Sequence, residues 1–330
     1  MNSITRRRFL TAGAAGAMGL AAYHASRAEP SHDGKALIAI TLDLEMSRNF
    51  PKWEDTHWDY EKGNLDDAAK KYTVEVCRRV KKAGGVAHLF VVGRMFEQAD
   101  VTWLKDLARD GHRIGNHTYD HVNVLAKKLE EIQFRFQRSP WLVEGRTPEQ
   151  VIVENIRLTT AALKTRIGVD PAGFRTPGGF ANGLADRADV RKWLLDQGFT
   201  WASCKYPAHP NSPAMSEPTE EVLKGIISAQ EKAQPFKYPE GLIEVPMSPI
   251  SDIGAFRTGR WKLDWFLKVI RQGVEWAIEK RAVFDFLAHP SCLGVVDPEC
   301  KTVDMILDLV KRAENKAVVV GLDEFAKRAK

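Results

Sequence analysis

The sequence predicts an α/β fold in which parallel strands form a closed or nearly closed barrel. Short apolar runs alternate with amphipathic helical segments after residue 29, a pattern typical of parallel strands joined by crossover helices. About seven or eight such units follow one another, as in a TIM-barrel-like fold. No repeat or low-complexity linker divides them, so we expect a single domain over residues 29–330.

The expected strands are short apolar runs. The first, residues 35–41, contains an unbroken apolar core and is expected to be buried. The strands expected after it are 86–92, 112–115, 173–174, 199–203, 242–245, 282–287 and 317–320.

The expected helices have start and stop signals. Residues 65–83 place apolar side chains on one stripe, with Asn64 as the N-cap and a Gly-Gly pair as the stop. Thr147 before Pro148 starts another helix, which runs to about residue 167, because proline is favoured at the first helical position. The remaining helices are expected at 102–109, 187–197, 262–279 and 303–313.

Two polar insertions interrupt this alternation, at residues 122–146 and 205–241, and the second is rich in proline. Insertions of this length in a compact domain usually form the rim or lid of a site. We therefore expect both of them to lie near the functional site.

The first 28 residues have the features of a twin-arginine export signal. Arg6, Arg7 and Arg8 precede a mildly apolar stretch, and small residues follow near position 28, where a signal peptidase would cleave. The apolar stretch is shorter than the ~20 residues that a membrane span requires. We expect export to the periplasm or the extracellular space; an uncleaved membrane anchor is the alternative.

Composition excludes several classes of protein. The chain has 330 residues, 44% of them hydrophobic, which excludes a disordered or collagen-like chain. The net charge of +5 falls to +1, from 44 basic and 43 acidic residues, once the four arginines of the export signal are removed. We therefore expect no nucleic-acid partner. The four cysteines have no zinc-ribbon spacing, and whether Cys292 and Cys300 pair stays open.

Four polar clusters fall at the ends of expected strands, where a parallel barrel carries its chemistry. Asp43 and Glu45 follow the first strand and point to the same side. His117 and His121 are four residues apart, so a helical turn would place both imidazoles within reach of one ion. Each cluster alone also fits a structural role, such as a capping acid or a solvated histidine.

The third and fourth clusters each contribute a single charged or titratable side chain. Arg175 stands before a Pro-Gly-Gly turn, and a guanidinium at a strand end can orient a carboxylate. His289 ends the apolar run at 282–287, although a lone histidine is more often a core or surface residue.

Taken in order, these clusters resemble the motifs of the polysaccharide deacetylase family, which includes chitin, chitooligosaccharide and peptidoglycan N-deacetylases and xylan esterases. The most specific segment is GHRIGNHTYDH, residues 111–121, which resembles the family's histidine metal motif. HLFVVGRMFE, FRTPGG and FLAHP resemble its second strand, its arginine motif and its final histidine motif. The resemblance spans most of residues 29–330 and implies a distorted (β/α) barrel of about seven parallel strands, one divalent metal ion and hydrolytic deacetylation.

The resemblance also implies roles for individual residues. His117 and His121 would bind the metal, His289 would be the general acid, and Arg175 would hold the catalytic base. Many members carry two adjacent aspartates after the first strand, whereas here the second acid comes one position later. We assign Asp43 as the base and Glu45 as the third metal ligand, and the reverse assignment stays open.

A second departure concerns the support of the catalytic histidine. Many members have an acidic-Trp motif after the fifth strand, but residues 199–205 contain no carboxylate. Asp285 is either a substitute partner of His289 or points away from it. The sequence therefore leaves the polarisation of His289 unexplained.

The expected function is that of an exported, metal-dependent hydrolase that removes acetyl groups from a glycan or an acetylated amino sugar. Zinc is the expected ion, with cobalt, nickel and manganese as alternatives. Two other hypotheses stay open: a metal-dependent C–N hydrolase of a small amide or cyclic imide, and a non-catalytic carbohydrate-binding protein on the same scaffold. The sequence does not distinguish N- from O-deacetylation.

Overall fold

The structure is a computed structural model that describes residues 32, 34–56 and 61–329. The chain divides into two units, residues 1–33 and 34–330, and the second is the subject here. The predicted export signal, residues 1–28, lies outside the described residues.

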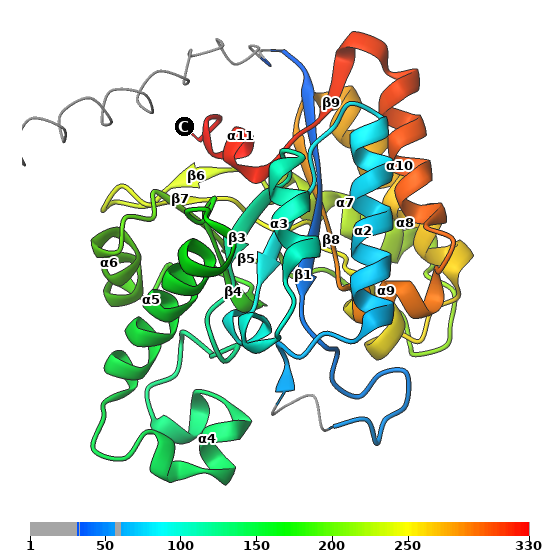
Figure 1. Ribbon diagram of the computed structural model, residues 1–330. Helices are drawn as coiled ribbons and strands as arrows, with labels where there is room; N and C mark the ends of the chain where they lie inside the picture. The colour runs from blue at the N-terminus through cyan, green and yellow to red at the C-terminus, as the bar shows by residue number, and fades with distance from the viewer. Residues whose placement is uncertain (1–31, 33, 57–60, 330) are drawn as a thin grey trace, which may run out of the picture. The chain divides into compact units, whose positions relative to one another are not determined.

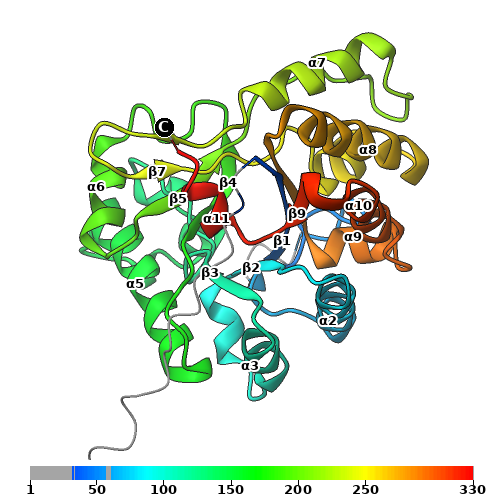
Figure 2. The same ribbon diagram turned by 90° about the horizontal axis from the view of Figure 1, so that it is seen from above.

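A curled and mostly parallel sheet forms the centre of residues 34–330, with helices packed around its outer side (Figures 1 and 2). The described strands are β1 (Ala36–Leu44), β2 (His88–Val91), β3 (Arg113–Asn116), β4 (Phe174–Phe180), β5 (Trp201–Lys205), β6 (Phe236–Lys237), β7 (Ile243–Glu244), β8 (Val283–Ala288) and β9 (Ala317–Val319). Their order is β6-β7-β5-β4-β3-β2-β1-β8, and β9 pairs with the start of β1.

This arrangement confirms the predicted barrel of parallel strands. The pairing between β6 and β7 is antiparallel, while the other pairings in the described part of the chain are parallel. The sheet is open, because β6 and β8 stand at the two ends of the strand order.

Helices follow most strands and cover the outer side of the sheet, as Figure 2 shows. The longer helices are α2 (Asp67–Lys82), α3 (Thr102–Arg109), α5 (Pro148–Ile167), α6 (Ala188–Asp196), α7 (Glu220–Glu231), α8 (Leu263–Lys280) and α10 (Lys301–Arg312). The shorter ones are α4 (Phe134–Arg138), α9 (Pro290–Val296) and α11 (Leu322–Ala326). Among the described helices, none combines the length and the apolar character that crossing a membrane requires.

Helix starts follow the local capping chemistry, and one predicted cap is wrong. Thr147 caps α5 as predicted, because its hydroxyl accepts the backbone N–H of Gln150. Helix α2 is capped by Asp66 rather than by Asn64, since the Asp66 carboxylate accepts the N–H of Ala69 at 2.7 Å.

The two predicted insertions contain regular structure that their polar composition did not indicate. Residues 122–146 include α4 and two short 3-10 helices, and residues 205–241 include α7 and β6. The four cysteines are free thiols, and all are buried, so Cys292 and Cys300 are not paired in this structure.

The alternation of side chains along β1 leads from the apolar core to a polar site. The even-numbered residues from Ala36 to Leu44 pack into the main core, whereas Leu37 and Ala39 belong to a separate apolar cluster on the other face. The next two positions of that second row are Thr41 and Asp43, both buried. The same face of one strand is therefore apolar at its start and polar at its carboxyl end.

Buried Glu244 joins β7 to β5 and makes the stability of the fold depend on pH. Its carboxylate accepts the backbone N–H groups of Cys204 and Lys205 at 2.7 and 2.8 Å and the hydroxyl of Tyr238 at 2.7 Å. Burial nevertheless raises the pKa of Glu244 to about 7. The folded state thus holds this proton more tightly than the unfolded chain does.

We expect this group to stabilise the fold fully below pH 4.5 and to lose that contribution as the pH rises through about 7. Glu244→Gln retains a hydrogen-bond acceptor and cannot ionise. It should therefore remove roughly 3 kcal/mol from the change in the free energy of unfolding with pH. Thermal unfolding between pH 4 and 8 checks this. Glu240→Gln is the control, because Arg191 lowers the pKa of Glu240 instead of raising it. If the unfolding temperature changed equally with pH in the parent and in Glu244→Gln, the prediction would be contradicted.

Candidate active site

A cavity of about 340 Å³ lies at the carboxyl ends of β1 and β8 and beside β4. Five of the six predicted site residues line it: Asp43, Glu45, His117, His121 and His289. The sixth, Arg175, is completely buried and contacts Asp43. The volume is at the lower end of the range for small-molecule sites.

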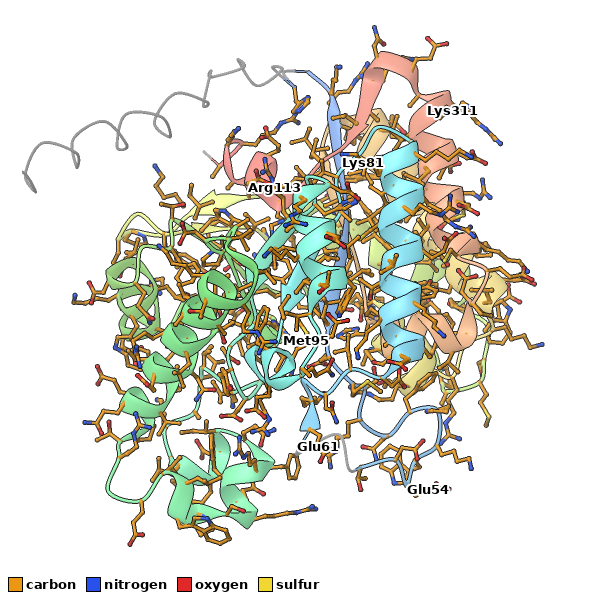
Figure 3. The ribbon with its side chains drawn as sticks, viewed as in Figure 1. Glu54, Glu61, Lys81, Met95, Arg113 and Lys311 are labelled. Atoms are coloured by element: carbon orange, nitrogen blue, oxygen red, sulfur yellow. The ribbon has the colours of Figure 1, made fainter. Side chains whose placement is uncertain are left out.

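A larger hollow of about 850 Å³ lies between α2 and α10 and contains none of the predicted site residues. Figure 3 shows Lys81 and Lys311, on these two helices, at the end of the barrel opposite to Glu54 and Glu61, which follow β1. Parallel barrels carry their chemistry at the carboxyl ends of the strands. The smaller cavity is therefore the candidate active site.

Glu45, His117 and His121 form a cluster that fits a divalent metal ion. One ligand atom from each residue lies within 4.8 Å of the other two. The Nδ1 of His117 is 3.0 Å from the carbonyl oxygen of Arg175, which can only accept, so Nδ1 carries the proton and Nε2 is left as a ligand atom. Two imidazoles and one carboxylate are a donor set typical of zinc and other borderline divalent ions.

The electrostatics keep these ligands in the form that binds a metal. Burial lowers the pKa of His117 to about 4 and also lowers the pKa of His121, so both rings are neutral at pH 7. Burial alone would raise the pKa of Glu45, but its contacts with His121 and Lys62 outweigh burial and hold that pKa well below its usual range. The Nζ of Lys62 lies 3.2 Å from Glu45 Oε1, a contact that the sequence interpretation missed.

The two histidines come together in a loop, and the predicted helical turn is wrong. Thr118 and His121 have left-handed backbones with φ of 59° and 57°. Side chains accept hydrogen bonds from the backbone of this loop: Asn116 Oδ1 accepts the N–H of Thr118, and the Thr118 hydroxyl accepts the N–H of Val122. The ring centroids of His117 and His121 are 5.2 Å apart, so a tight polar turn achieves the approach that a helix would have given.

Arg175 holds Asp43 from beneath the cavity. Its Nη1 lies 3.0 Å from Asp43 Oδ1 and 2.8 Å from the Thr41 hydroxyl, and its Nη2 contacts Asp285. The guanidinium also lies over the ring of Phe90, 4.3 Å from its centroid. Asp285 thus pairs with Arg175 and not with His289, which excludes it as the substitute partner.

The partner of His289 is Asp252, which the sequence analysis missed. Asp252 Oδ1 lies 2.8 Å from His289 Nδ1, and Oδ2 accepts the backbone N–H of His289 at 2.7 Å. Burial opposes protonation of the ring, but Asp252, with Glu45 and Asp43, outweighs it and raises the pKa of His289. The one signal in the sequence was the place of Asp252 in the loop after β7, which belongs to the functional end of a parallel barrel.

We expect Asp252→Asn to lower turnover at this candidate active site roughly ten- to hundredfold, the size of one charge-assisted hydrogen bond of about 1.5–3 kcal/mol. The asparagine of this variant would still accept one hydrogen bond but would no longer stabilise the protonated imidazole. Steady-state kinetics measure this loss. Asp264→Asn is the control variant, because Asp264 is an exposed aspartate in the first turn of α8. Unchanged kcat in Asp252→Asn would show that the pair has no role in turnover.

One family model matches part of this chain, and solved structures share its fold. Residues 64–193 match the family model for polysaccharide deacetylase. The chain is 31% identical over 72 residues to a chitooligosaccharide deacetylase of Azorhizobium caulinodans. That match covers 22% of this chain and 34% of the relative, so it spans about a third of the relative's length.

Solved structures share the fold at low sequence identity. A protein described as a polysaccharide deacetylase from Mycobacterium smegmatis has a TM-score of 0.58 at 16% identity, with 91% of this chain and 92% of that chain covered. One from Pseudomonas aeruginosa PAO1 has a TM-score of 0.58 at 11% identity, covering 88% and 89%. The allantoinase PuuE has a TM-score of 0.57 at 13% identity, covering 91% and 93%.

The fold alone does not select the reaction, because deacetylases and an allantoinase share it to the same degree. The family match is more specific, and it includes the positions of His117, His121 and Arg175. The chain therefore carries a polysaccharide-deacetylase-like segment, residues 64–193, within a barrel fold that it shares with polysaccharide deacetylases and an allantoinase.

Proposed function

We propose that this protein is a metal-dependent hydrolase that removes acetyl groups from a glycan or an acetylated amino sugar. The observation that carries the proposal is the convergence of three groups on one cavity. The cluster of Glu45, His117 and His121 lies beside Asp43 and His289, with His289 Nε2 at 3.7 Å from Glu45 Oε1 and at 3.9 Å from Asp43 Oδ2. The family match supports the carbohydrate substrate.

Each side chain has a distinct part in the hydrolysis. A divalent ion held by Glu45, His117 and His121 would polarise the acetyl carbonyl and make the attacking water more acidic. Asp43 takes the proton of that water, and Arg175 fixes the orientation of its carboxylate. His289, protonated through its pair with Asp252, gives a proton to the leaving amine or alkoxide.

The backbone near Gly178 is placed to assist. Gly178 and Gly179 line the cavity after Arg175, and Gly178 has a φ of +78°, a conformation that glycine adopts without strain. We propose that a backbone N–H of this turn donates to the developing oxyanion.

The test is release of acetate from a panel of acetylated substrates by the metal-loaded protein. The panel contains chitooligosaccharides, peptidoglycan fragments, O-acetylated xylo-oligosaccharides, small amides and cyclic imides. We expect acetate from at least one of the glycans and almost none with Asp43→Asn. Turnover confined to small amides or imides would replace the deacetylase proposal, and glycan binding that survives Asp43→Asn without turnover in the parent would indicate a binding protein.

We further propose that residues 1–28 direct export by the twin-arginine route and that residues 29–330 act as one catalytic domain in the periplasm or outside the cell. The arginine triplet followed by an apolar stretch supports this proposal. Fractionation of cells that express the parent and an Arg6→Lys, Arg7→Lys, Arg8→Lys variant tests it, and equal export of both would contradict it.

A further inference from the structure

A second hollow of about 270 Å³ adjoins the active-site cavity. Lys62, His121 and Arg257 line both hollows, so they mark the junction between them. The remaining walls of the second hollow come mainly from the insertion at residues 122–146, with Arg48 and Pro177 on its other sides. The second hollow therefore adjoins the candidate metal cluster, where a substrate larger than the active-site cavity can extend into it.

Among the described residues, the junction carries one cation, Arg257, that no acidic side chain neutralises. Of the two carboxylates in the active-site cavity, Asp43 is paired with Arg175 and Glu45 is paired with Lys62. Arg257 is half-buried, and its side chain forms no ion pair or hydrogen bond within the described part of the chain. A cation in this position is available to a ligand.

Two further charged side chains of the described residues, Arg48 and Glu131, line the second hollow. The guanidinium of Arg48 lies over the Phe134 ring, 4.3 Å from its centroid, and so contributes charge to this wall. Glu131 is the acid that lines the hollow, and its carboxylate already accepts the backbone N–H groups of Lys127 and Lys128 at 3.0 and 3.3 Å. Glu131 is therefore held by the backbone of its own loop and, among the described contacts, forms no ion pair with Arg257.

The backbone that carries Arg257 is anchored on its N-terminal side. Arg257 belongs to a single π-helical turn, Ile253–Thr258, and Asp252 caps that turn by accepting the N–H of Ile253 at 2.8 Å. The neighbouring Phe256 is buried and packs against Phe266, with ring centroids 4.8 Å apart. Since Asp252 also binds His289, the position of Arg257 is tied to that of the general acid.

We propose that Arg257 recognises an acidic group of the substrate, which makes the substrate an acetylated glycan with a carboxylate or sulfate on the sugar next to the acetylated position. This inference rests on the proposed deacetylase function. A guanidinium binds a planar carboxylate or a sulfate through paired hydrogen bonds, and these bonds strengthen in a site that is partly shielded from water.

Calorimetric binding of three tetrasaccharides to the metal-loaded Asp43→Asn protein tests the proposal without turnover. The probes are an N-acetylglucosamine tetramer, an alternating glucuronate and N-acetylglucosamine tetramer, and a sulfated N-acetylglucosamine tetramer. Each is measured with and without Arg257→Gln, and Arg257→Lys is the charge-preserving variant. Arg260→Gln is the matched control, because this exposed arginine lies three residues further along and lines neither hollow.

We expect an acidic tetramer to bind at least about tenfold more tightly than the neutral one, the size of a charge-assisted hydrogen bond. Arg257→Gln should remove this preference, Arg257→Lys should retain part of it, and Arg260→Gln should leave it intact. Preference for the glucuronate or for the sulfated probe identifies the acid.

Equal binding of all three probes, or a preference that survives Arg257→Gln, would overturn the inference. Absence of binding of all three would overturn it as well. Acetate release by the parent protein is measured separately on the neutral and glucuronate tetramers. Selective binding without acetate release would refute only the proposed reaction, whereas acetate release at equal rates from both would refute only the acidic substrate.

Discussion

Replacing Asp43 by Asn is expected to lower kcat for acetate release about 10²- to 10⁴-fold, the usual contribution of a general base, with little change in metal content. Asparagine can still accept the hydrogen bond from Arg175, which lies 3.0 Å from Asp43 Oδ1, so the local geometry should persist. It cannot take a proton from water. Steady-state kinetics together with elemental analysis of the purified variant measure both quantities.

Glu45→Gln is the matched variant because it makes the same chemical change two residues later. If Glu45 is the third ligand, this variant should lose the metal, and its loss of activity should follow the loss of metal. The opposite pattern, with metal lost in Asp43→Asn and retained in Glu45→Gln, would exchange the two roles.

Replacing Arg175 by Met is expected to give the largest loss of stability, about 3–5 kcal/mol, because it removes the cation from a buried ionic group. Arg175 is completely buried and contacts both Asp43 and Asp285. Burial already raises the pKa of Asp285 although Arg175 opposes this rise. Without the guanidinium, both carboxylates would have to be protonated or remain charged without a partner.

Chemical denaturation of the metal-free proteins measures this loss without a contribution from bound metal. Arg113→Met is the control, because Arg113 forms a partly exposed ion pair with Asp323 at 3.2 Å, and such pairs contribute about 0–1 kcal/mol. An Arg175→Met protein that unfolds within about 1 kcal/mol of the parent would show that the buried group is not needed for stability.

The alternation of strands and helices was sufficient to predict the barrel, because burial on both faces leaves an almost continuous apolar run in the sequence. It did not predict α7 or α4. The Thr219 cap and the apolar stripe of α7 stand among prolines that favour a loop, and α4 has only five residues, too few for a helical period to be read. Nor did it show that the sheet is open, because closure depends on contacts between distant strands.

The parts of the site formed by residues close together in the sequence could be predicted. The contacts between residues that only the fold brings together could not. His117 and His121 stand close in the chain, so their approach was expected, although the left-handed residue Thr118 achieves it without a helix. Asp252 and His289 are 37 residues apart, and no local pattern links them. Their pairing depends on the loop after β7 reaching the end of β8.

The central claim is that a divalent ion bound by Glu45, His117 and His121 is required for deacetylation. The most direct test is acetate release by the metal-free protein during titration with zinc. We predict no activity at the start, a rise that levels off near about one equivalent of metal, and no rise with His117→Ala. Full activity before zinc is added, or no acetate from any glycan once one equivalent is bound, would contradict the claim.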